Sequence, residues 1–121
     1  RSLNASHLER RHVWVVEDDT VFLGDLRRAL TPFGNASTDL VAVFQPHAYI
    51  DDHWELYSNS AFQRALPGRP LHKWEHIERY SVALLDRVGD LLRRGAAAYG
   101  EVFASTVCAR MSWCSTAEIY R

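Results

Sequence analysis

Three adjacent acids, Glu17, Asp18 and Asp19, directly follow a short apolar run, HVWVV. Adjacent carboxylates repel one another, and a bound cation relieves that repulsion. The run at 12–16 predicts a strand buried on both faces, as in a parallel sheet, and ligand crevices lie at the carboxyl ends of such strands. Strand alternation puts Glu17 and Asp19 on one side and turns Asp18 away. The triplet indicates a Mg²⁺ or Mn²⁺ site completed by phosphate oxygens, with a solvated acidic turn as the equally weighted alternative.

The rest of the chain predicts helices and strands in alternation, because apolar runs and helical stripes are separated by Pro, Gly and capping residues. These elements are a helix at 26–30 capped by Asp25 and stopped by Pro32 and Gly34, a strand at 39–44, a long ordered loop at 45–74 with a short helix near 58–64, a helix at 76–94 closed by Gly95, and a third, weaker apolar stretch at 102–109, taken as a strand. The order predicts one α/β domain over residues 1–121, with a mixed sheet and flanking helices.

Composition excludes several classes of protein. Apolar residues make up 47% of the 121 residues and charged residues 24%, which is typical of a globular domain. The formal charge of −1 provides no excess of cations for binding nucleic acid by bulk electrostatics. No apolar run approaches the roughly 20 residues of a membrane-spanning helix. Lys73 is the only lysine, which removes most lysine-dependent chemistry.

The segment VWVVEDDTVFLGDLRRAL resembles the first strand of response-regulator receiver domains. That family requires a phosphate-accepting Asp at the end of its third strand and a lysine on a late strand. Here Asp51 and Asp52 follow QPHAYI, a poor strand, and Lys73 falls in the Pro-rich loop with no lysine after it. The receiver, a phosphorylation module, is therefore the second hypothesis.

The same segment resembles the acidic motif of nucleotide-sugar-dependent glycosyltransferases of the GT-A type, which reads DxD, EDD or DDD. It is similar to an uncharacterised eukaryotic group reading roughly W-x-x-E-x-D-V-x-F-x-G-D/N. Three later segments match that group in order: DLVAVF, IERYSVALLDRV and YGEVFASTVC. The resemblance covers nearly the whole chain and implies a partial GT-A-like, Rossmann-like mixed sheet.

The resemblance also implies roles for single residues. Asp19 would bind Mn²⁺ or Mg²⁺, Glu17 would reach the metal or the ribose, and Asp18 is the third member of this nucleotide-sugar site. The metal neutralises the diphosphate leaving group as the sugar moves to a glycan, protein or lipid acceptor. Glu101 is the candidate general base of an inverting reaction. The alternative for Glu101 is a surface acid at the start of a helix or strand.

The chain begins almost at the acidic motif, so the strands that grip the nucleotide in GT-A enzymes are expected upstream of it. An inactive fragment, or a non-catalytic α/β interaction domain, is the third hypothesis. A sheet without those strands would expose an edge and an apolar face, which predicts self-association or poor solubility.

Cysteines and sequons bear on the compartment. Cys108 and Cys114 flank ARMSW and either close a small disulfide loop or remain free and buried. The sequons Asn4-Ala5-Ser6 and Asn35-Ala36-Ser37 would be glycosylation acceptors in a secretory lumen. Together with the family resemblance they favour the lumen of the Golgi or endoplasmic reticulum, with any membrane anchor upstream.

The long loop is rich in histidine and aromatic residues. Its histidines form no HxH or HExxH spacing, so the sequence has no zinc signature. Trp54, Tyr57 and Trp74 would form a sugar-stacking platform or anchor the loop to the core. The second reading is favoured, because large rings dominate packing energetics.

Overall fold

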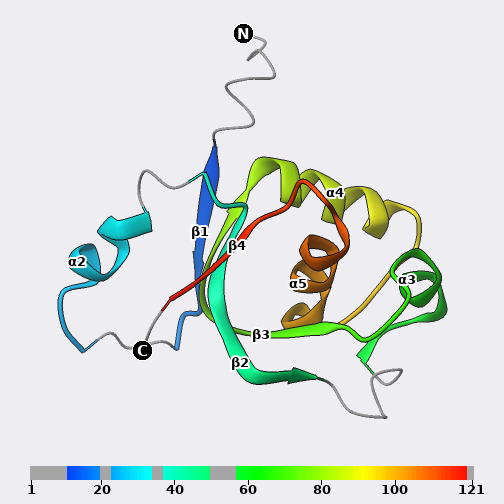
Figure 1. Ribbon diagram of the computed structural model, residues 1–121, viewed down its shortest axis with the longest axis horizontal. Helices are drawn as coiled ribbons and strands as arrows, with labels where there is room; N and C mark the ends of the chain where they lie inside the picture. Colours follow the sequence, from blue (N-terminus) through cyan, green and yellow to red (C-terminus); the bar gives the residue numbers. More distant parts are fainter. Residues whose placement is uncertain (1–10, 20–22, 34–36, 50–56, 120–121) are drawn as a thin grey trace, which may run out of the picture.

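A computed structural model describes residues 11–19, 23–33, 37–49 and 57–119 of the chain. It is a mixed four-stranded sheet with helices packed on it, so the predicted α/β fold with a mixed sheet and flanking helices is confirmed (Figure 1). The elements in chain order are β1 (His12–Val16), α2 (Leu26–Leu30), the 3₁₀ helix η1 (Thr31–Phe33), β2 (Leu40–Tyr49), α3 (Ser60–Ala65), β3 (Leu71–Ser81), α4 (Val82–Arg93), α5 (Gly100–Arg110) and β4 (Thr116–Glu118).

The strand order is β1-β3-β2-β4, with β3 antiparallel to both β1 and β2, and with β4 parallel to β2. The ladder between β2 and β3 is irregular. Val41 pairs with Arg79 and Val43 pairs with Trp74, so two steps along β2 correspond to five along β3. The extra residues make a bulge at 75–78 of β3, and a bulge redirects side chains that regular pleating would turn elsewhere.

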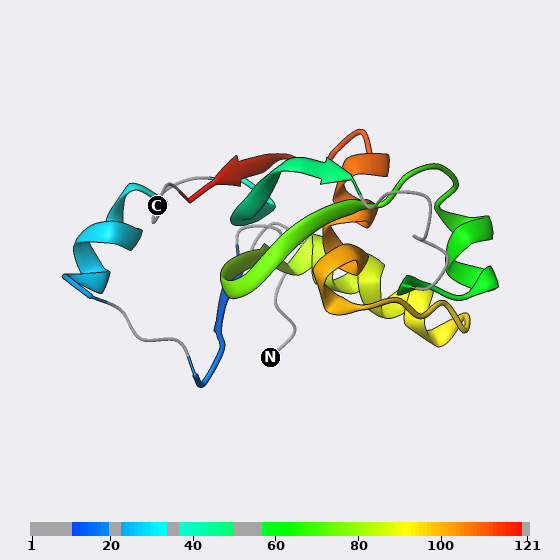
Figure 2. The ribbon, with the colours of Figure 1, turned by 90° about the horizontal axis from the view of Figure 1, so that it is seen from below.

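Each face of the sheet has its own apolar cluster. In Figure 2, α4 and α5 lie on one side of the strands and α2 lies on the other. The larger cluster joins the sheet to α3, α4 and α5; its buried members are Leu40, Ala42, Phe62, Leu66, Tyr80, Leu84, Leu91, Ala96, Phe103, Ala104, Val107 and Cys108. The smaller cluster is on the opposite face, because Val41 alternates with Leu40 along β2. It contains Val41, Ile77 and Ile119, with Trp14, Leu30, Phe33, Val43 and Ala117 packed against them.

The strand at 12–16 is confirmed, but its predicted environment is wrong. β1 is antiparallel to its neighbour and is the outermost strand of the described sheet. Val13, Val15 and Val16 are exposed instead of buried on both faces. A short run of β-branched residues has the same composition in a central strand and in an edge strand, so the pattern does not distinguish the two positions.

The predicted helix at 76–94 is wrong in its first part. Residues 71–81 form β3, and the helix begins at Val82, where Ser81 Oγ accepts a hydrogen bond from the Leu84 backbone N–H at 3.1 Å. Gly95 does follow the helix, with φ +91°, as a C-terminal glycine should. The predicted loop at 45–74 is therefore a strand at both of its ends, because β2 continues to Tyr49 and β3 begins at Leu71.

The stretch at 102–109, predicted as a strand, is helix α5. Its residues 102–108 are all buried, so this helix has no polar face to reveal a helical period. Two shorter predictions are confirmed. Asp25 caps α2 by accepting a hydrogen bond from the Arg28 backbone N–H, and a short helix at 60–65 interrupts the region between β2 and β3.

Asn59 ties α3 to the connection between α4 and α5. Its Oδ1 accepts hydrogen bonds from the backbone N–H groups of Phe62 (2.9 Å) and Ala97 (3.0 Å), and its Nδ2 donates to the Gly95 carbonyl (2.8 Å). We expect Asn59→Ala to lower the free energy of unfolding by about 1–2 kcal/mol, measured in urea. Asn59→Asp keeps both acceptor bonds and should lose less. Equal losses in the two variants would contradict this account.

Candidate functional site

Glu17 is bound to β3 rather than extended into solvent. Its backbone N–H donates to the His76 carbonyl at 3.1 Å, and its Oε2 lies 3.0 Å from His76 Nδ1. Both side chains remain partly exposed, so this contact fixes the position of the first acid without removing it from water. Glu17 is therefore held at the end of β1, over the bulged segment of β3.

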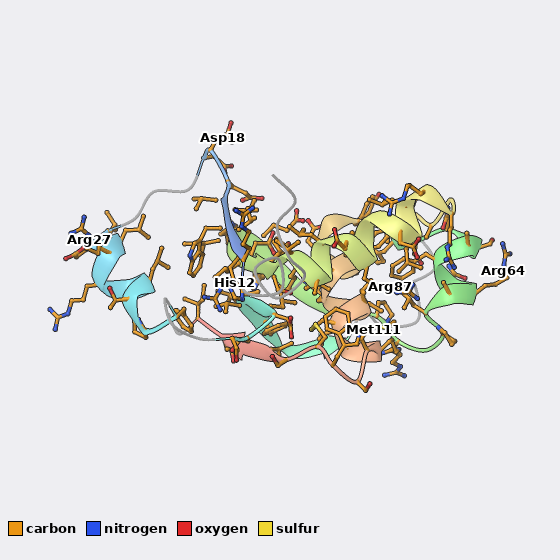
Figure 3. All side chains as sticks on the ribbon, turned by 90° about the horizontal axis from the view of Figure 1, so that it is seen from above. His12, Asp18, Arg27, Arg64, Arg87 and Met111 are labelled. Carbon is orange, nitrogen blue, oxygen red and sulfur yellow. A yellow bond between two sulfur atoms is a disulfide. The ribbon has the colours of Figure 1, made fainter. Side chains whose placement is uncertain are left out.

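Asp18 and Asp19 lie in an exposed turn after β1. Figure 3 shows Asp18 at the projecting tip of this turn, with its side chain directed away from the helices. Strand alternation does not extend into the triplet, because β1 ends at Val16. Within the described residues, no three His, Cys, Asp or Glu side chains converge as a metal-binding group.

The donor chemistry of the turn nevertheless fits a hard divalent cation. Exposed carboxylates are ligands that Mg²⁺ and Mn²⁺ prefer, and Mg²⁺ is commonly held by one or two carboxylates together with phosphate oxygens and water. Asp18 and Asp19 are of this kind. The remaining ligands would have to come from a bound diphosphate and from solvent.

A buried charge cluster lies on β3 beside the acidic turn. The Lys73 side chain is fully buried, with Nζ 2.5 Å from Glu78 Oε2 and 3.8 Å from Glu75 Oε1. The ammonium also lies 5.8 Å from the centre of the Tyr80 ring. Burial, followed by the charge and hydrogen bond of Glu78, holds the pKa of Tyr80 far above its usual range, so its phenol stays protonated. Lys73, predicted in a loop, is thus a strand residue that compensates buried carboxylates.

Glu75 links this cluster to the start of α5. A Cβ placed on Gly100 would collide with Glu75 Oε1, so the glycine leaves the space that the carboxylate occupies. Burial raises the pKa of Glu75; Lys73 lowers it, and nearby carboxylates raise it further. Those neighbours come from three elements: they are Glu101, Glu78 and Glu17. Carboxylates that follow β1, lie on β3 and begin α5 therefore all act electrostatically on Glu75.

Glu101 stands in the first turn of α5 and is partly buried. Besides acting on Glu75, its charge raises the pKa of His72, although burial has the larger, lowering effect on that histidine and Lys73 lowers it too. The structure places Glu101 at the start of a helix, as the alternative reading holds; its role as a base stays a prediction.

An aromatic row runs along β3 next to these acids. His72, Trp74 and His76 occupy alternate positions, and the Trp74 ring stacks on His76 at 5.7 Å and meets His72 edge-on at 5.8 Å. Trp74 was predicted in a loop and instead lies in a strand. Trp54 lies outside the described residues. The rings along β3 present a partly exposed aromatic surface of the kind on which sugars stack.

Tyr57 packs edge-on against Tyr99, with ring centres 5.6 Å apart. The two rings border a shallow, open pocket of about 300 Å³ whose other lining residues are Ser58, Asn59, Ala97 and Ala98. Tyr57 therefore packs against Tyr99 just before α5, and neither ring belongs to the two core clusters.

Sequence reasoning missed Glu75 and Glu78. They stand in the segment HKWEHIERYS, whose spacing resembles a polar helix face. Glu78 lies in the matched segment IERYSVALLDRV, but the resemblance gives it no role, and no motif marks Glu75. The one lysine of the chain could have indicated them, because Glu75 and Glu78 lie close to Lys73 in sequence and could neutralise its charge in the folded protein.

Cys108 and Cys114 form a disulfide, which links the end of α5 to the segment before β4, so both cysteines of the chain are paired. Asp51 and Asp52, the receiver candidates, lie outside the described residues, as do both sequon asparagines. Within the described ranges, no helix has the length and apolar character to span a bilayer.

Comparisons of the chain with protein-family models, with curated proteins and with solved structures found no match.

Replacing Lys73 tests the buried cluster. We expect Lys73→Met to lower the free energy of unfolding by about 3–5 kcal/mol, because it leaves Glu78 buried without its cation. The double variant Lys73→Met/Glu78→Gln removes both charges and should recover most of that loss in urea unfolding. A single variant as stable as the parent would show that Lys73 does not compensate Glu78.

Glu75→Gln tests the electrostatics at the start of α5. The pKa of Glu75 is raised above 4.5 in the folded chain. Between pH 4.5 and that raised pKa, the folded chain keeps a proton that the unfolded chain has lost. The free energy of unfolding therefore falls as the pH rises through this window. The variant should gain stability at neutral pH, by less than about 1 kcal/mol since solvent screens the group. The gain should vanish below pH 4.5 in thermal unfolding. A gain that is independent of pH would contradict this assignment.

Proposed function

We propose that this chain is the acidic-motif half of a metal-assisted glycosyltransferase that uses a nucleotide-sugar donor. The observation that carries the proposal is the placement of Glu17, which follows β1 and lies 3.0 Å from His76 of β3, where Glu17 and Glu101 both act electrostatically on Glu75. Two of these acids belong to segments that resemble GT-A motifs. The mixed sheet is the type that the resemblance implies.

In this proposal the exposed turn holds the donor's diphosphate through a cation. Asp19, with Asp18 beside it, would hold Mn²⁺ or Mg²⁺, and the bound ion would neutralise the diphosphate leaving group. Glu17 is restrained by His76, so it is set to meet the ribose or a metal-bound water without losing side-chain entropy on binding.

The proton of the acceptor hydroxyl would be taken by a carboxylate at the start of α5. Glu101 is the base that the sequence predicts, and Glu75 is a second candidate that the fold adds. The raised pKa of Glu75 favours this role, because proton transfer is most effective when the pKa approaches the working pH. Trp74, whose ring stacks on His76, offers a flat surface for the sugar.

The receiver hypothesis is less well supported. Receiver sheets are parallel, whereas β3 runs antiparallel to both of its neighbours. A receiver lysine must reach a phosphoryl group, and Lys73 is buried against Glu78. A non-catalytic interaction domain with the same fold remains the competing proposal, and metal binding separates the two.

The compartment is proposed from the disulfide. Disulfides persist in oxidising environments, and Cys108 is bonded to Cys114. Together with the two sequons, this favours the lumen of the Golgi or endoplasmic reticulum.

Mn²⁺ titration followed by NMR tests the proposed function, since the paramagnetic ion broadens signals near its site. We expect broadening to begin at Glu17, Asp18 and Asp19, and UDP to tighten the binding of Mn²⁺. Asp19→Asn should weaken Mn²⁺ binding about tenfold or more, because it removes a charged ligand. Asp86→Asn, on an exposed site of α4, is the matched control and should change nothing. If Asp19→Asn and the parent show the same broadening at the same Mn²⁺ concentrations, the metal site and the proposed function are both wrong.

A further inference from the structure

The outer edge of β1 carries backbone groups that β3 does not use. The Glu17 N–H donates to β3, and the Arg11 carbonyl accepts from the Val82 N–H, so odd-numbered residues of β1 direct their peptide groups toward β3. The peptide groups of His12, Trp14 and Val16 consequently point outward. Within the described part of the chain, no strand lies on that side.

The side chains along this edge are apolar and accessible. Val13, Val15 and Val16 are 43%, 42% and 47% exposed. Soluble proteins usually protect an edge strand with lysine, proline or a bulge, and β1 has none of these. Val13 and Val15 lie across from Tyr80 and Glu78, on the face that the helices cover elsewhere. The edge therefore has the properties of a surface that another strand covers.

The sequence of β1 is complementary to itself in the antiparallel direction. If two copies meet with Trp14 opposite Trp14, His12 lies opposite Val16, and these pairs exchange hydrogen bonds through the outward peptide groups. Val13 then lies opposite Val15 of the second copy, in the closely spaced non-hydrogen-bonded pairs. The four valines of the two strands would cover one another on a single face.

The charges at the two ends match as well. In the same register Arg11 of one copy lies opposite Glu17 of the other, just beyond the two ends of β1. Each end of the paired strands then has an Arg–Glu pair, so any one-residue slip separates both ion pairs and also reverses the faces.

We propose that β1 pairs antiparallel with β1 of a second copy of this chain, giving a two-fold symmetric dimer with one continuous eight-stranded sheet. A second copy of β1 is favoured over an unrelated strand, because it supplies both the valines opposite Val13 and Val15 and the opposite charges at the two ends. An unrelated strand need not supply these residues. The interface is isologous, because the same residues, 11–17, serve both sides. It is smaller than a standard interface, so a weak dimer that dissociates on dilution is expected.

The first measurement is the mass in solution, by light scattering and sedimentation between about 1 and 300 µM chain. We expect a concentration-dependent dimer. Val16→Pro removes an N–H that points outward and keeps every hydrogen bond to β3, so an edge strand tolerates this proline. The variant should be monomeric. Val16→Thr keeps the N–H and should remain dimeric. A monomeric parent at every concentration, or a dimer that survives Val16→Pro, would overturn the proposal.

Charge exchange tests the register and does not depend on the proline variant folding. Arg11→Glu or Glu17→Arg alone should weaken the dimer about tenfold, because each brings like charges together at both ends. Combining the two restores opposite charges and should restore the dimer. A double variant as weak as either single variant would exclude this register. Arg27→Glu on α2 is the control and should leave the dimer unchanged.

Cysteine pairing gives a direct reading of the register. Both native cysteines are in a disulfide, so new ones react alone. Val13→Cys and Val15→Cys chains, oxidised separately, should give little cross-linked dimer, whereas a mixture should cross-link readily. This follows because position 13 faces position 15 of the other copy at a Cβ separation of about 5 Å. Equal cross-linking in the separate and mixed samples would contradict the pairing.

Discussion

The structure depends on compensating two cations that β3 buries on its two faces. Lys73 lies on the side of the helices and is neutralised by Glu78, with Glu75 nearby. Arg79 lies on the opposite side, where its guanidinium donates to the backbone carbonyls of Phe33 and Thr38 and lies over the Trp14 ring. A buried charge without partners costs several kcal/mol, so β1, η1 and the segment before β2 must all be in place around β3. The central strand is thus fixed by polar contacts as much as by its apolar neighbours.

This constraint explains the position of the candidate site. The bulge at 75–78 allows Glu75 and Glu78 to approach the same ammonium from neighbouring positions, which a regular strand would direct to opposite faces. The carboxylate of Glu75 then enters the space that Gly100 leaves at the start of α5. One irregularity in the ladder therefore brings β3 and α5 together at the end of β1 where Glu17 is held by His76.

The sequence predicts the parts of this fold that depend on local patterns. Asp25 and Gly95 mark helix ends through their own conformational preferences, and the run at 12–16 forms a strand through its β-branched residues. Helix α5 was missed because burial on all sides removes its period, and β3 was missed because its charged residues are inside. For the site, Glu17 and Glu101 lie in recognisable motifs. Glu75 acquires its role only through contacts with residues distant in sequence, and these contacts cannot be read from one amino-acid sequence.

The cluster at this end of the sheet carries more negative than positive charge. Burial raises the pKa of Glu75, and three neighbouring carboxylates act in the same direction against the single cation Lys73. Asp18 and Asp19 add further carboxylates just beyond the sheet, in water. Like charges held together by a fold store repulsion that an added cation releases, so this end of the sheet attracts positive charge before any particular ligand is specified. Glu17 is the acid of the triplet that acts on Glu75, so a divalent ion that reached Glu17 would also favour the charged form of Glu75.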